Sequence, residues 1–379
     1  MKIGIVCYPT FGGSGVVATE LGLELSKRGH EIHFITYNQP VRLELLGNNV
    51  HFHEVSVPEY PLFHYQPYEL ALSSKLVDMV KLHQIEVLHV HYAIPHAYAA
   101  YMAQKMLRED NIYVPIVTTL HGTDITLVGS HPFYKPAVTF SINKSDAVTA
   151  VSQSLKDDTL RLFDIKNEIN VVTNFIDISK FNNNYTDCQR AMMATDDEKI
   201  ITHISNMREV KRIPDVINIF NAIQKEIPAK LMMVGEGPER EPAERLCETL
   251  GISDKVVFFG NSNEIDRILC FSDLFLLPSK TESFGLSALE AMASGVPVIS
   301  SNTGGIPEVN KDAFSGYLSP VGDVEDMSNN AVHVLKDETV LNQFKINAKQ
   351  QAKHFDIHQI VPQYEAIYQE TLNKCKILN

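Results

Sequence analysis

Short apolar runs alternate with amphipathic stretches along the first part of the chain. The first run, Lys2–Cys7, is rich in β-branched residues and leads into a glycine-rich loop. Beyond that loop, apolar residues recur at helical spacing at Val16, Val17, Leu21 and Leu25. Further runs of strand length lie at Glu31–Thr36, Ile85–His91, Val114–Leu120, Ala147–Val151 and Asn170–Thr173. Strands that alternate with helices predict a parallel, doubly wound sheet.

The same alternation begins again at Lys199, after a polar segment (174–195) in which we expect the connection between two domains to begin. Residues 199–223 have the pattern of a strand, a loop and a helix, as the N-terminus does. Later apolar runs lie at Lys230–Val234, Val256–Phe259, Leu274–Leu277 and Val296–Ser300. The pattern predicts an α/β protein of two Rossmann-like domains, 1–170 and 171–356, which face a central cleft.

The last segment, 357–379, has helical periodicity up to Lys376. Its apolar positions fall on one side of the predicted helix, at Ile360, Tyr364, Ile367, Tyr368 and Leu372. A helix with one apolar side has to bury that side against another element. We therefore expect this C-terminal helix to pack back on the first domain.

Composition narrows the possible functions. The 379 residues include 44% hydrophobic and 21% charged residues, and the formal net charge is −13. An acidic chain without a basic run is unsuited to nucleic acid or to an anionic membrane surface. The five cysteines are scattered without a CxxC spacing, and no apolar run approaches membrane-spanning length. We expect a cytoplasmic protein without structural zinc; its oligomeric state is left open, a homo-oligomer included.

The stretch TESFGLSALEAMAS, Thr281–Ser294, follows a buried strand and has the pattern of a loop that leads into a helix. Free amides at a helix N-terminus attract anions, so the backbone N–H groups of Phe284, Gly285 and Leu286 could bind a phosphate. Two carboxylates, Glu282 and Glu290, bracket these amides. Glu290 borders the buried side of the helix, where a carboxylate needs a partner. A capping Glu282 and a solvated Glu290 would explain the pattern equally well.

In the first half, candidate chemistry lies in the loops at strand ends. The run GGSG (Gly12, Gly13, Ser14, Gly15) lets backbone approach a phosphate closely, although a tight turn alone would also explain it. The run HGTD places His121 and Thr123 after a strand, where ligand groups collect. His89 and His91 share one face of a strand without an evident third ligand, so a role in the core or in support of the site is favoured over a metal.

In the second half, the run SNMREVK occupies the loop after the first strand. Its Arg208 and Lys211 are three residues apart, and two cations at a strand end suit a diphosphate. The alternative is a solvated pair of surface charges.

Together these motifs resemble those of the retaining glycosyltransferases of family four. The resemblance rests on GGSG, HGTD, the R-x-x-K spacing, GEGPER (Gly235–Arg240), E-x7-E and GGIPE (Gly304–Glu308), and their order covers nearly the whole chain. It implies the GT-B architecture of two Rossmann-like domains. The runs CYPTFGGSGVVATELG, VLHVHYAIPHA and TTLHGTDITLVG are similar to those of family members that act in bacillithiol biosynthesis. The similarity implies UDP-GlcNAc as the donor and the hydroxyl of L-malate as the acceptor.

The resemblance also implies roles for individual residues. Those closest to the chemistry would be His121, Arg208, Lys211 and Glu282. The donor would be bound by Gly13, Gly15, Asn206, Phe284, Gly285, Leu286 and Glu290. The acceptor would be lined by Ser14, Tyr92, Thr123 and Ser152. The chain has no D-x-D motif, so cations and helix N-termini are expected to stabilise the departing UDP without a metal or another cofactor.

Retention normally suggests a carboxylate nucleophile, which the sequence does not supply. The family is commonly interpreted as using a front-face displacement, in which the departing phosphate deprotonates the acceptor, and we adopt that interpretation. Three alternatives remain open. A family member with another small acceptor would share every donor motif and differ near Tyr92 and the segment Tyr60–Tyr68. A UDP-sugar epimerase on the same fold would need no malate, and a sugar-binding protein without activity would need neither Arg208 nor Lys211.

Overall fold

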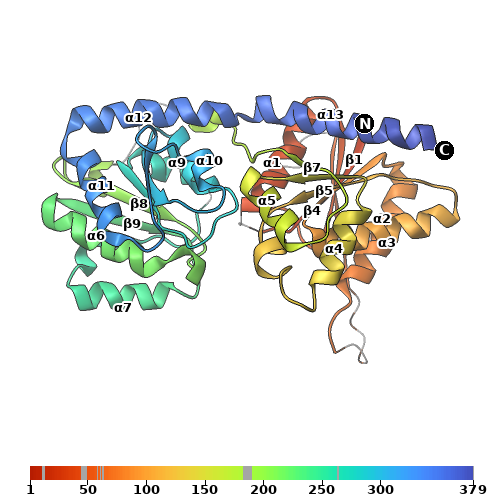
Figure 1. The fold of residues 1–379 in the computed structure, drawn as a ribbon, viewed down its shortest axis with the longest axis horizontal. Helices are drawn as coiled ribbons and strands as arrows, with labels where there is room; N and C mark the ends of the chain where they lie inside the picture. The colour runs from red at the N-terminus through yellow and green to blue at the C-terminus, as the bar shows by residue number, and fades with distance from the viewer. Residues whose placement is uncertain are drawn as a thin grey trace. The chain divides into compact units, whose positions relative to one another are not determined.

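A computed structural model describes residues 1–10, 13–43, 49–57, 59, 61, 64–181, 190–262 and 264–378. The chain divides into two compact units, drawn in Figure 1. Unit 1 comprises Met1–Phe175 together with Ile357–Asn379, and unit 2 comprises Ile176–Asp356. The division after Phe175 lies five residues beyond the boundary expected from the sequence, because the short strand around residue 170 still pairs within the first sheet.

Unit 1 is built on a parallel sheet with the order β3-β2-β1-β4-β5-β6-β7. Its strands are β1 (Lys2–Val6), β2 (Glu31–Thr36), β3 (Val50–Glu54), β4 (Val87–His91), β5 (Ile116–Leu120), β6 (Ala147–Ala150) and β7 (Ile169–Val171). Its helices are α1 (Gly13–Lys27), α2 (Tyr68–His83), α3 (Tyr98–Glu109), α4 (Lys135–Lys144), α5 (Gln153–Leu162) and α13 (Ile357–Leu378).

Unit 2 has a second parallel sheet with the order β10-β9-β8-β11-β12-β13. Its strands are β8 (Lys199–Ile204), β9 (Ala229–Val234), β10 (Val256–Phe258), β11 (Leu274–Leu277), β12 (Val298–Ser301) and β13 (Gly316–Ser319). Its helices are α6 (Ile213–Glu226), α7 (Arg240–Leu250), α8 (Ile265–Cys270), α9 (Leu286–Ala293), α10 (Ile306–Val309), α11 (Val324–Lys336) and α12 (Glu338–Ala352).

In each unit the strands lie between helices on both sides (Figure 1). Strands β1, β4, β5 and β11 are buried over nearly their whole length, as parallel strands covered on both faces should be. The predicted fold class, two Rossmann-like domains with parallel sheets, is therefore confirmed. Two strands were not predicted, β3 and β13, because each lies at the edge of its sheet and lacks a continuous apolar run.

The C-terminal helix α13 belongs to unit 1, where it packs beside α1. Tyr368 is fully buried and its hydroxyl lies 2.7 Å from Nδ1 of His89 on β4. Glu365 on the same helix pairs with Arg28, just beyond α1. Residues 357–378 thus complete the first unit although they come last in the chain.

The described cysteines differ in oxidation state. Cys7, Cys247 and Cys375 are buried free thiols, whereas Cys270 is disulfide-bonded. Disulfides are rare in cytosolic proteins, so the cysteines do not support the expected cytoplasmic location. No helix in the described part of the chain is both long and apolar enough to span a bilayer.

Candidate active site

In unit 2, the loop after β8 holds the two predicted phosphate-binding cations. Asn206 and Arg208 are exposed, and Arg208 forms no ion pair with a described residue. A single helical turn, Glu209–Lys211, then leads into α6. The ammonium of Lys211 pairs with the carboxylate of Glu282, and both side chains are less than a fifth exposed. The structure therefore brings together one predicted cation and one predicted carboxylate from loops that are 71 residues apart.

The loop after β11 leads into α9, as the sequence predicts. Gly285 precedes the helix with φ of +97°, a left-handed conformation that glycine adopts without strain. The amides of Phe284, Gly285 and Leu286 donate to no oxygen of a described residue, so they are available to an anion. Phe284 itself is buried against Phe355, which fixes the loop in place.

Glu290 is the fifth residue of α9 and is 8% exposed. The prediction that it borders the buried side of the helix is confirmed. Glu282, by contrast, lies in the loop before the helix and not on it. The two carboxylates therefore come from separate parts of the same strand-loop-helix unit.

Glycines in the remaining motifs allow these loops to pack closely. A Cβ on Gly235 would lie 1.9 Å from the carbonyl oxygen of Ser205, and one on Gly237 would lie 2.0 Å from that of Asn206. A Cβ on Gly304 would lie 1.9 Å from the carbonyl oxygen of Glu282. GEGPER thus supports the Arg208 loop, and GGIPE supports the Glu282 loop, so neither glycine pair needs to touch a substrate directly.

In unit 1, Gly13, Ser14 and Gly15 form the first residues of α1, directly after the loop that follows β1. Gly12 lies outside the described residues. A Cβ on Gly15 would lie 2.5 Å from the carbonyl oxygen of Thr10, so glycine is required for the helix to begin this close to the loop. Gly13 is exposed, which leaves its backbone accessible to a ligand.

Three predicted ligands of unit 1 meet at the ends of β1, β4 and β5. The hydroxyl of Tyr92 donates to Oγ of Ser14 at 2.6 Å. The ring of Tyr92 lies 5.0 Å from that of His121, centroid to centroid. Nε2 of His121 is in turn 2.8 Å from Nδ1 of His91. Ser14, Tyr92 and His121 therefore form one contiguous polar surface, with His91 behind it.

The electrostatics of this surface favour neutral groups. Burial, with a smaller effect from His96, lowers the pKa of His121 to about 3. Burial also raises the pKa of the Tyr92 phenol, and the Ser14 hydrogen bond opposes that shift. At neutral pH both side chains are uncharged hydrogen-bonding groups, suited to sugar or alcohol hydroxyls.

Asp124 was not predicted as a site residue, yet it shapes the HGTD loop. Its carboxylate accepts from the amides of Ala93 at 2.9 Å, Gly122 at 3.0 Å and His121 at 3.3 Å. Burial raises its pKa to about 6, and these amide donors limit the rise. The available signal was its place as the fourth residue of HGTD, because an aspartate after a strand often accepts amides of its own turn.

The other two predicted acceptor ligands have different surroundings. Thr123 is exposed and begins a short helical turn, Thr123–Leu127. Ser152 is fully buried, and its hydroxyl accepts from the amide of Leu155 as the N-cap of α5. Its hydroxyl is therefore engaged in the cap, and contact of Ser152 with an acceptor stays a prediction.

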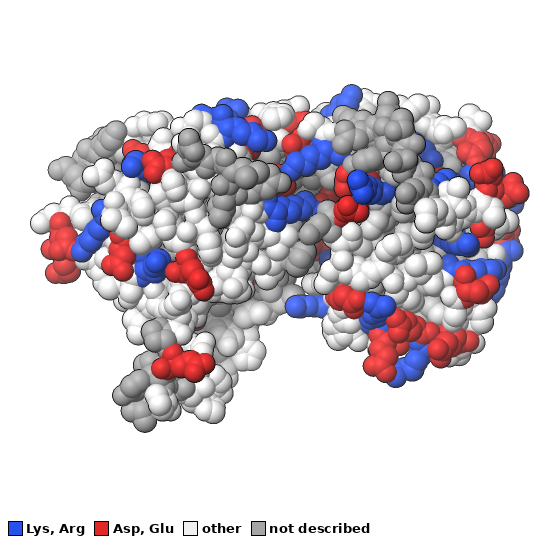
Figure 2. Space-filling view, turned by 180° about the vertical axis from the view of Figure 1, so that it is seen from behind, with Lys and Arg blue, Asp and Glu red and all other residues white. Residues whose placement is uncertain are grey.

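Surface charge is mixed. On the face seen from behind, Figure 2 shows acidic and basic side chains close to one another, with uncharged surface between the groups. No large area of this face, in its described part, has a single sign.

The fold and the motifs together define a class of protein, and comparison with known proteins shows which class it is. Residues 11–180 match the family described as Glycosyltransferase Family 4, and residues 189–351 match Glycosyl transferases group 1. The chain is 47% identical over 378 residues to N-acetyl-alpha-D-glucosaminyl L-malate synthase of Bacillus anthracis, covering 99% of this chain and 98% of that one. The protein therefore belongs to the family-4 glycosyltransferases and is an enzyme of that class.

Solved structures show the same fold. HepE of Anabaena in complex with UDP-glucose superimposes with a TM-score of 0.81 at 20% identity, covering 99% of this chain and 100% of HepE. Sucrose-phosphate synthase from Thermosynechococcus elongatus has a TM-score of 0.81 at 19% identity, with 98% and 99% covered. At this identity the comparison establishes the GT-B fold and nothing finer.

Proposed function

We propose that the protein transfers GlcNAc from UDP-GlcNAc to the hydroxyl of L-malate with retention of the α configuration, and releases UDP. The observation that supports this most is the 47% identity to a GlcNAc-malate synthase, which extends over almost the full length of both chains. Within that length, the Lys211–Glu282 pair of unit 2 and the Tyr92–Ser14 hydrogen bond of unit 1 are both formed.

Unit 2 binds the donor in this proposal. Arg208 and Lys211 contact the diphosphate, together with the amides of Phe284, Gly285 and Leu286. The ribose hydroxyls bond to Glu290. As the bond between the sugar and the phosphate breaks, negative charge grows on the departing UDP. Two cations and a helix N-terminus stabilise that charge, and the reaction then requires no metal ion.

Unit 1 binds the sugar and the acceptor. His121 contacts the transferred GlcNAc as a neutral group, and Ser14, Tyr92 and Thr123 surround malate. The malate carboxylates are met by helix N-termini and hydroxyls, because the strand ends of unit 1 present few cations. A helix N-terminus contributes about 0.3–1 kcal/mol to the binding of an exposed charge and about 2 when partly buried, so malate alone binds weakly.

Retention follows a front-face displacement in this proposal. The malate hydroxyl oxygen forms the new bond to the anomeric carbon as the bond to the phosphate oxygen breaks, and the hydroxyl proton moves to that departing oxygen. Asp124 is the carboxylate of the HGTD loop, but it is 3% exposed and already accepts three amides. It is therefore unsuited to act as the nucleophile of a double displacement.

The substrates are small molecules of the cytoplasm, where we place the enzyme. A UDP-release assay with UDP-GlcNAc and a panel of hydroxy acids and sugars tests the assignment. L-malate should give the highest kcat/KM, and omission of any acceptor should reduce UDP release to background. A sugar or another alcohol that is clearly preferred would contradict the malate assignment and leave the glycosyltransferase class intact.

A further inference from the structure

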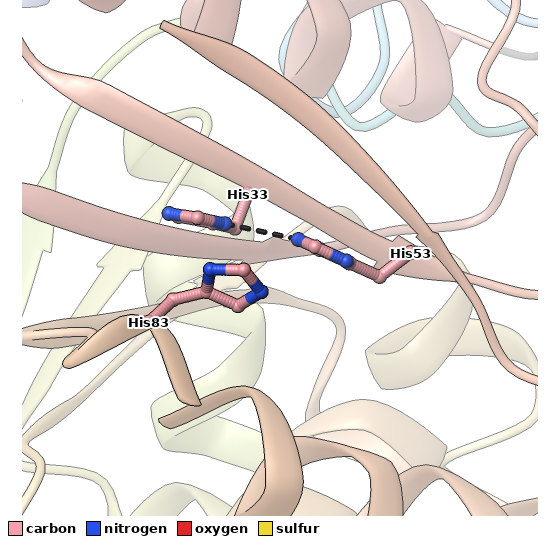
Figure 3. A group of neighbouring side chains, drawn as sticks. All are labelled: His33, His53 and His83. Atoms are coloured by element: carbon pink, nitrogen blue, oxygen red, sulfur yellow. Dashed lines mark hydrogen bonds between the residues drawn. The ribbon is translucent and has the colours of Figure 1, made fainter. Parts of the chain in front are cut away.

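Four histidines gather in unit 1, away from the loops of the candidate active site. His33 lies on β2, His51 and His53 lie on β3, and His83 is the last residue of α2. Ring centroids are 4.6 Å apart for His33 and His83, 4.8 Å for His53 and His83, and 5.2 Å for His33 and His53. Figure 3 shows the rings of His33, His53 and His83 directed toward one another.

Strand pairing explains why these rings meet. In the parallel register of β2 and β3, His33 is opposite His51 and Ile35 is opposite His53. Residues two apart on a strand share a face, so all three strand histidines project from the same side of the sheet. Helix α2 covers this side and ends at His83, which brings the fourth imidazole onto the cluster.

The nitrogen positions suit a metal ion. One ring nitrogen each from His33, His53 and His83 lies within 4.8 Å of the others. Nitrogens about 2.05 Å from a tetrahedral Zn²⁺ are about 3.3 Å from one another. Nδ1 of His33 and Nε2 of His53 are 2.9 Å apart, so they need to separate by a few tenths of an ångström while His83 moves inward. His83 is half-buried at a helix end, where such a movement is easy.

Glu31 supplies an orienting carboxylate. Its Oε1 lies 3.2 Å from Nε2 of His33, so Nε2 carries the proton and the lone pair of Nδ1 points toward His53. A carboxylate on the second nitrogen is the usual partner of a metal-binding histidine. Glu31 is itself held by Lys2, at 3.4 Å. A hydrogen bond from His53 to His33 satisfies the pair without a metal, and that bond is exchanged for coordination when an ion enters.

We propose that His33, His53 and His83 form a binding site for a divalent transition-metal ion of the Zn²⁺ class, with a water molecule as the fourth ligand. Three neutral imidazoles select Zn²⁺, Cu²⁺ and Ni²⁺ over Mg²⁺ and Ca²⁺, which prefer oxygen ligands. Because the ligands come from β2, the edge strand β3 and the end of α2, a bound ion would fasten this edge of the sheet. The site lies on strands and a helix end outside the substrate loops, so its role is structural.

A second grouping shares His33 and consists of Glu31, His33 and His51, with Glu31 at Nε2 of His33. We assign the ion to the three-histidine set because Glu31 is already paired with Lys2, and a carboxylate at the rear nitrogen strengthens His33 as a ligand. The two sets share only His33, so variants of His83, which belongs to the first set, and of His51, which belongs to the second, distinguish them.

Zn²⁺ binding to the tag-free full chain, stripped with EDTA and dialysed, tests the proposal by calorimetry and by metal analysis. We expect about one equivalent of tightly bound Zn²⁺ per chain and a higher melting temperature with Zn²⁺ than without. The variants His53→Gln and His83→Gln should lose both the tight Zn²⁺ binding and the rise in melting temperature. Glu31→Gln should weaken binding by about 10–100-fold. The matched control, His354→Gln, removes an exposed histidine of unit 2 and should bind as the wild type does.

Melting temperatures in EDTA show that each variant is folded before metal is added. Absence of stoichiometric binding by the wild type would overturn the proposal. So would undiminished binding by both His53→Gln and His83→Gln. Loss of binding in His51→Gln with retention in His83→Gln would overturn the ligand assignment. The readouts do not involve the transferase reaction, so they are independent of the proposed substrates.

Discussion

Replacing Lys211 with alanine should reduce turnover more than any other single change in unit 2. Lys211 is paired with Glu282, and the two side chains are 18% and 15% exposed, so water screens them little. The substitution removes a cation from the proposed diphosphate site and leaves the carboxylate of Glu282 without the Lys211 ammonium. That carboxylate then repels the negative charge that develops on UDP.

The magnitude follows from the charge and its surroundings. A cation about 4 Å from a developing unit charge contributes about 4 kcal/mol at an effective dielectric constant of about 20. Each 1.36 kcal/mol corresponds to a tenfold change in rate, so this is an upper limit of about 10³. Removal of one preorganised donor commonly reduces kcat by about 10²–10³. We expect Lys211→Ala near the upper end and Arg208→Ala, whose side chain has no carboxylate partner among described residues, near the lower end.

Initial rates of UDP release with both substrates saturating measure the effect. The matched control is Lys225→Ala, an exposed lysine in the last turn of α6 in the same unit, which should keep full activity. In the double variant Lys211→Ala/Glu282→Gln the combined loss should be smaller than the product of the single losses, because the repelling charge is gone. Rates within a few-fold of wild type for both Lys211→Ala and Arg208→Ala would show that these cations do not stabilise the departing UDP.

Three further results are expected. Tyr92→Phe removes the hydrogen bond to Ser14 and should raise the KM for malate by about 2–10-fold, with a smaller change in the KM for UDP-GlcNAc. Calorimetry should find little malate binding to the free wild-type enzyme. A Tyr92→Phe defect confined to UDP-GlcNAc, or tight malate binding without nucleotide, would place the acceptor site elsewhere. Saturating EDTA should leave initial rates unchanged, and a rate restored only by Mg²⁺ or Mn²⁺ would contradict the proposed stabilisation of UDP. Stability should fall as the pH drops from 7 to 5, as measured by urea unfolding. Burial lowers the folded-state pKa of His89 and His121 to about 3, below the value of about 6.5 in the unfolded chain. The unfolded state therefore binds more protons, and each of these histidines lowers the free energy of unfolding by about 2 kcal/mol at pH 5. The raised pKa of Asp124, about 6, increases the free energy of unfolding at pH 5 by about 1 kcal/mol, which is less than the two histidines remove. Equal stability at pH 7 and pH 5 would therefore contradict these pKa shifts.

The sequence was sufficient for the fold class because most strands of both sheets are buried on both faces. Such strands appear as continuous apolar runs, as at Leu274–Leu277. Strand β3 has the sequence VHFHE and is half exposed at the sheet edge, so it lacks the continuous apolar run by which the other strands were recognised. The histidine cluster could not be predicted for the same reason, because two of its members lie on that strand.

Local motifs of the candidate site could be predicted from the sequence, whereas contacts between distant loops could not. The candidate phosphate-binding elements depend on local patterns, such as the glycine before α9 and cations after a strand, and these are visible in one sequence. Contacts such as Lys211 with Glu282, or Tyr92 with Ser14, join loops that are 71 and 78 residues apart, and only the order of strands in the sheet brings them together. Asp124 was missed because its role is to hold backbone amides, which periodicity does not reveal.

The most direct test of the proposed reaction is the NMR spectrum of the product formed from UDP-GlcNAc and L-malate. We expect one glycoside in which the malate hydroxyl oxygen is bonded to C1 of GlcNAc, with the small H1–H2 coupling of an α anomer, in amounts equal to the UDP released. A β-linked product, or free GlcNAc in place of a malate glycoside, would contradict it.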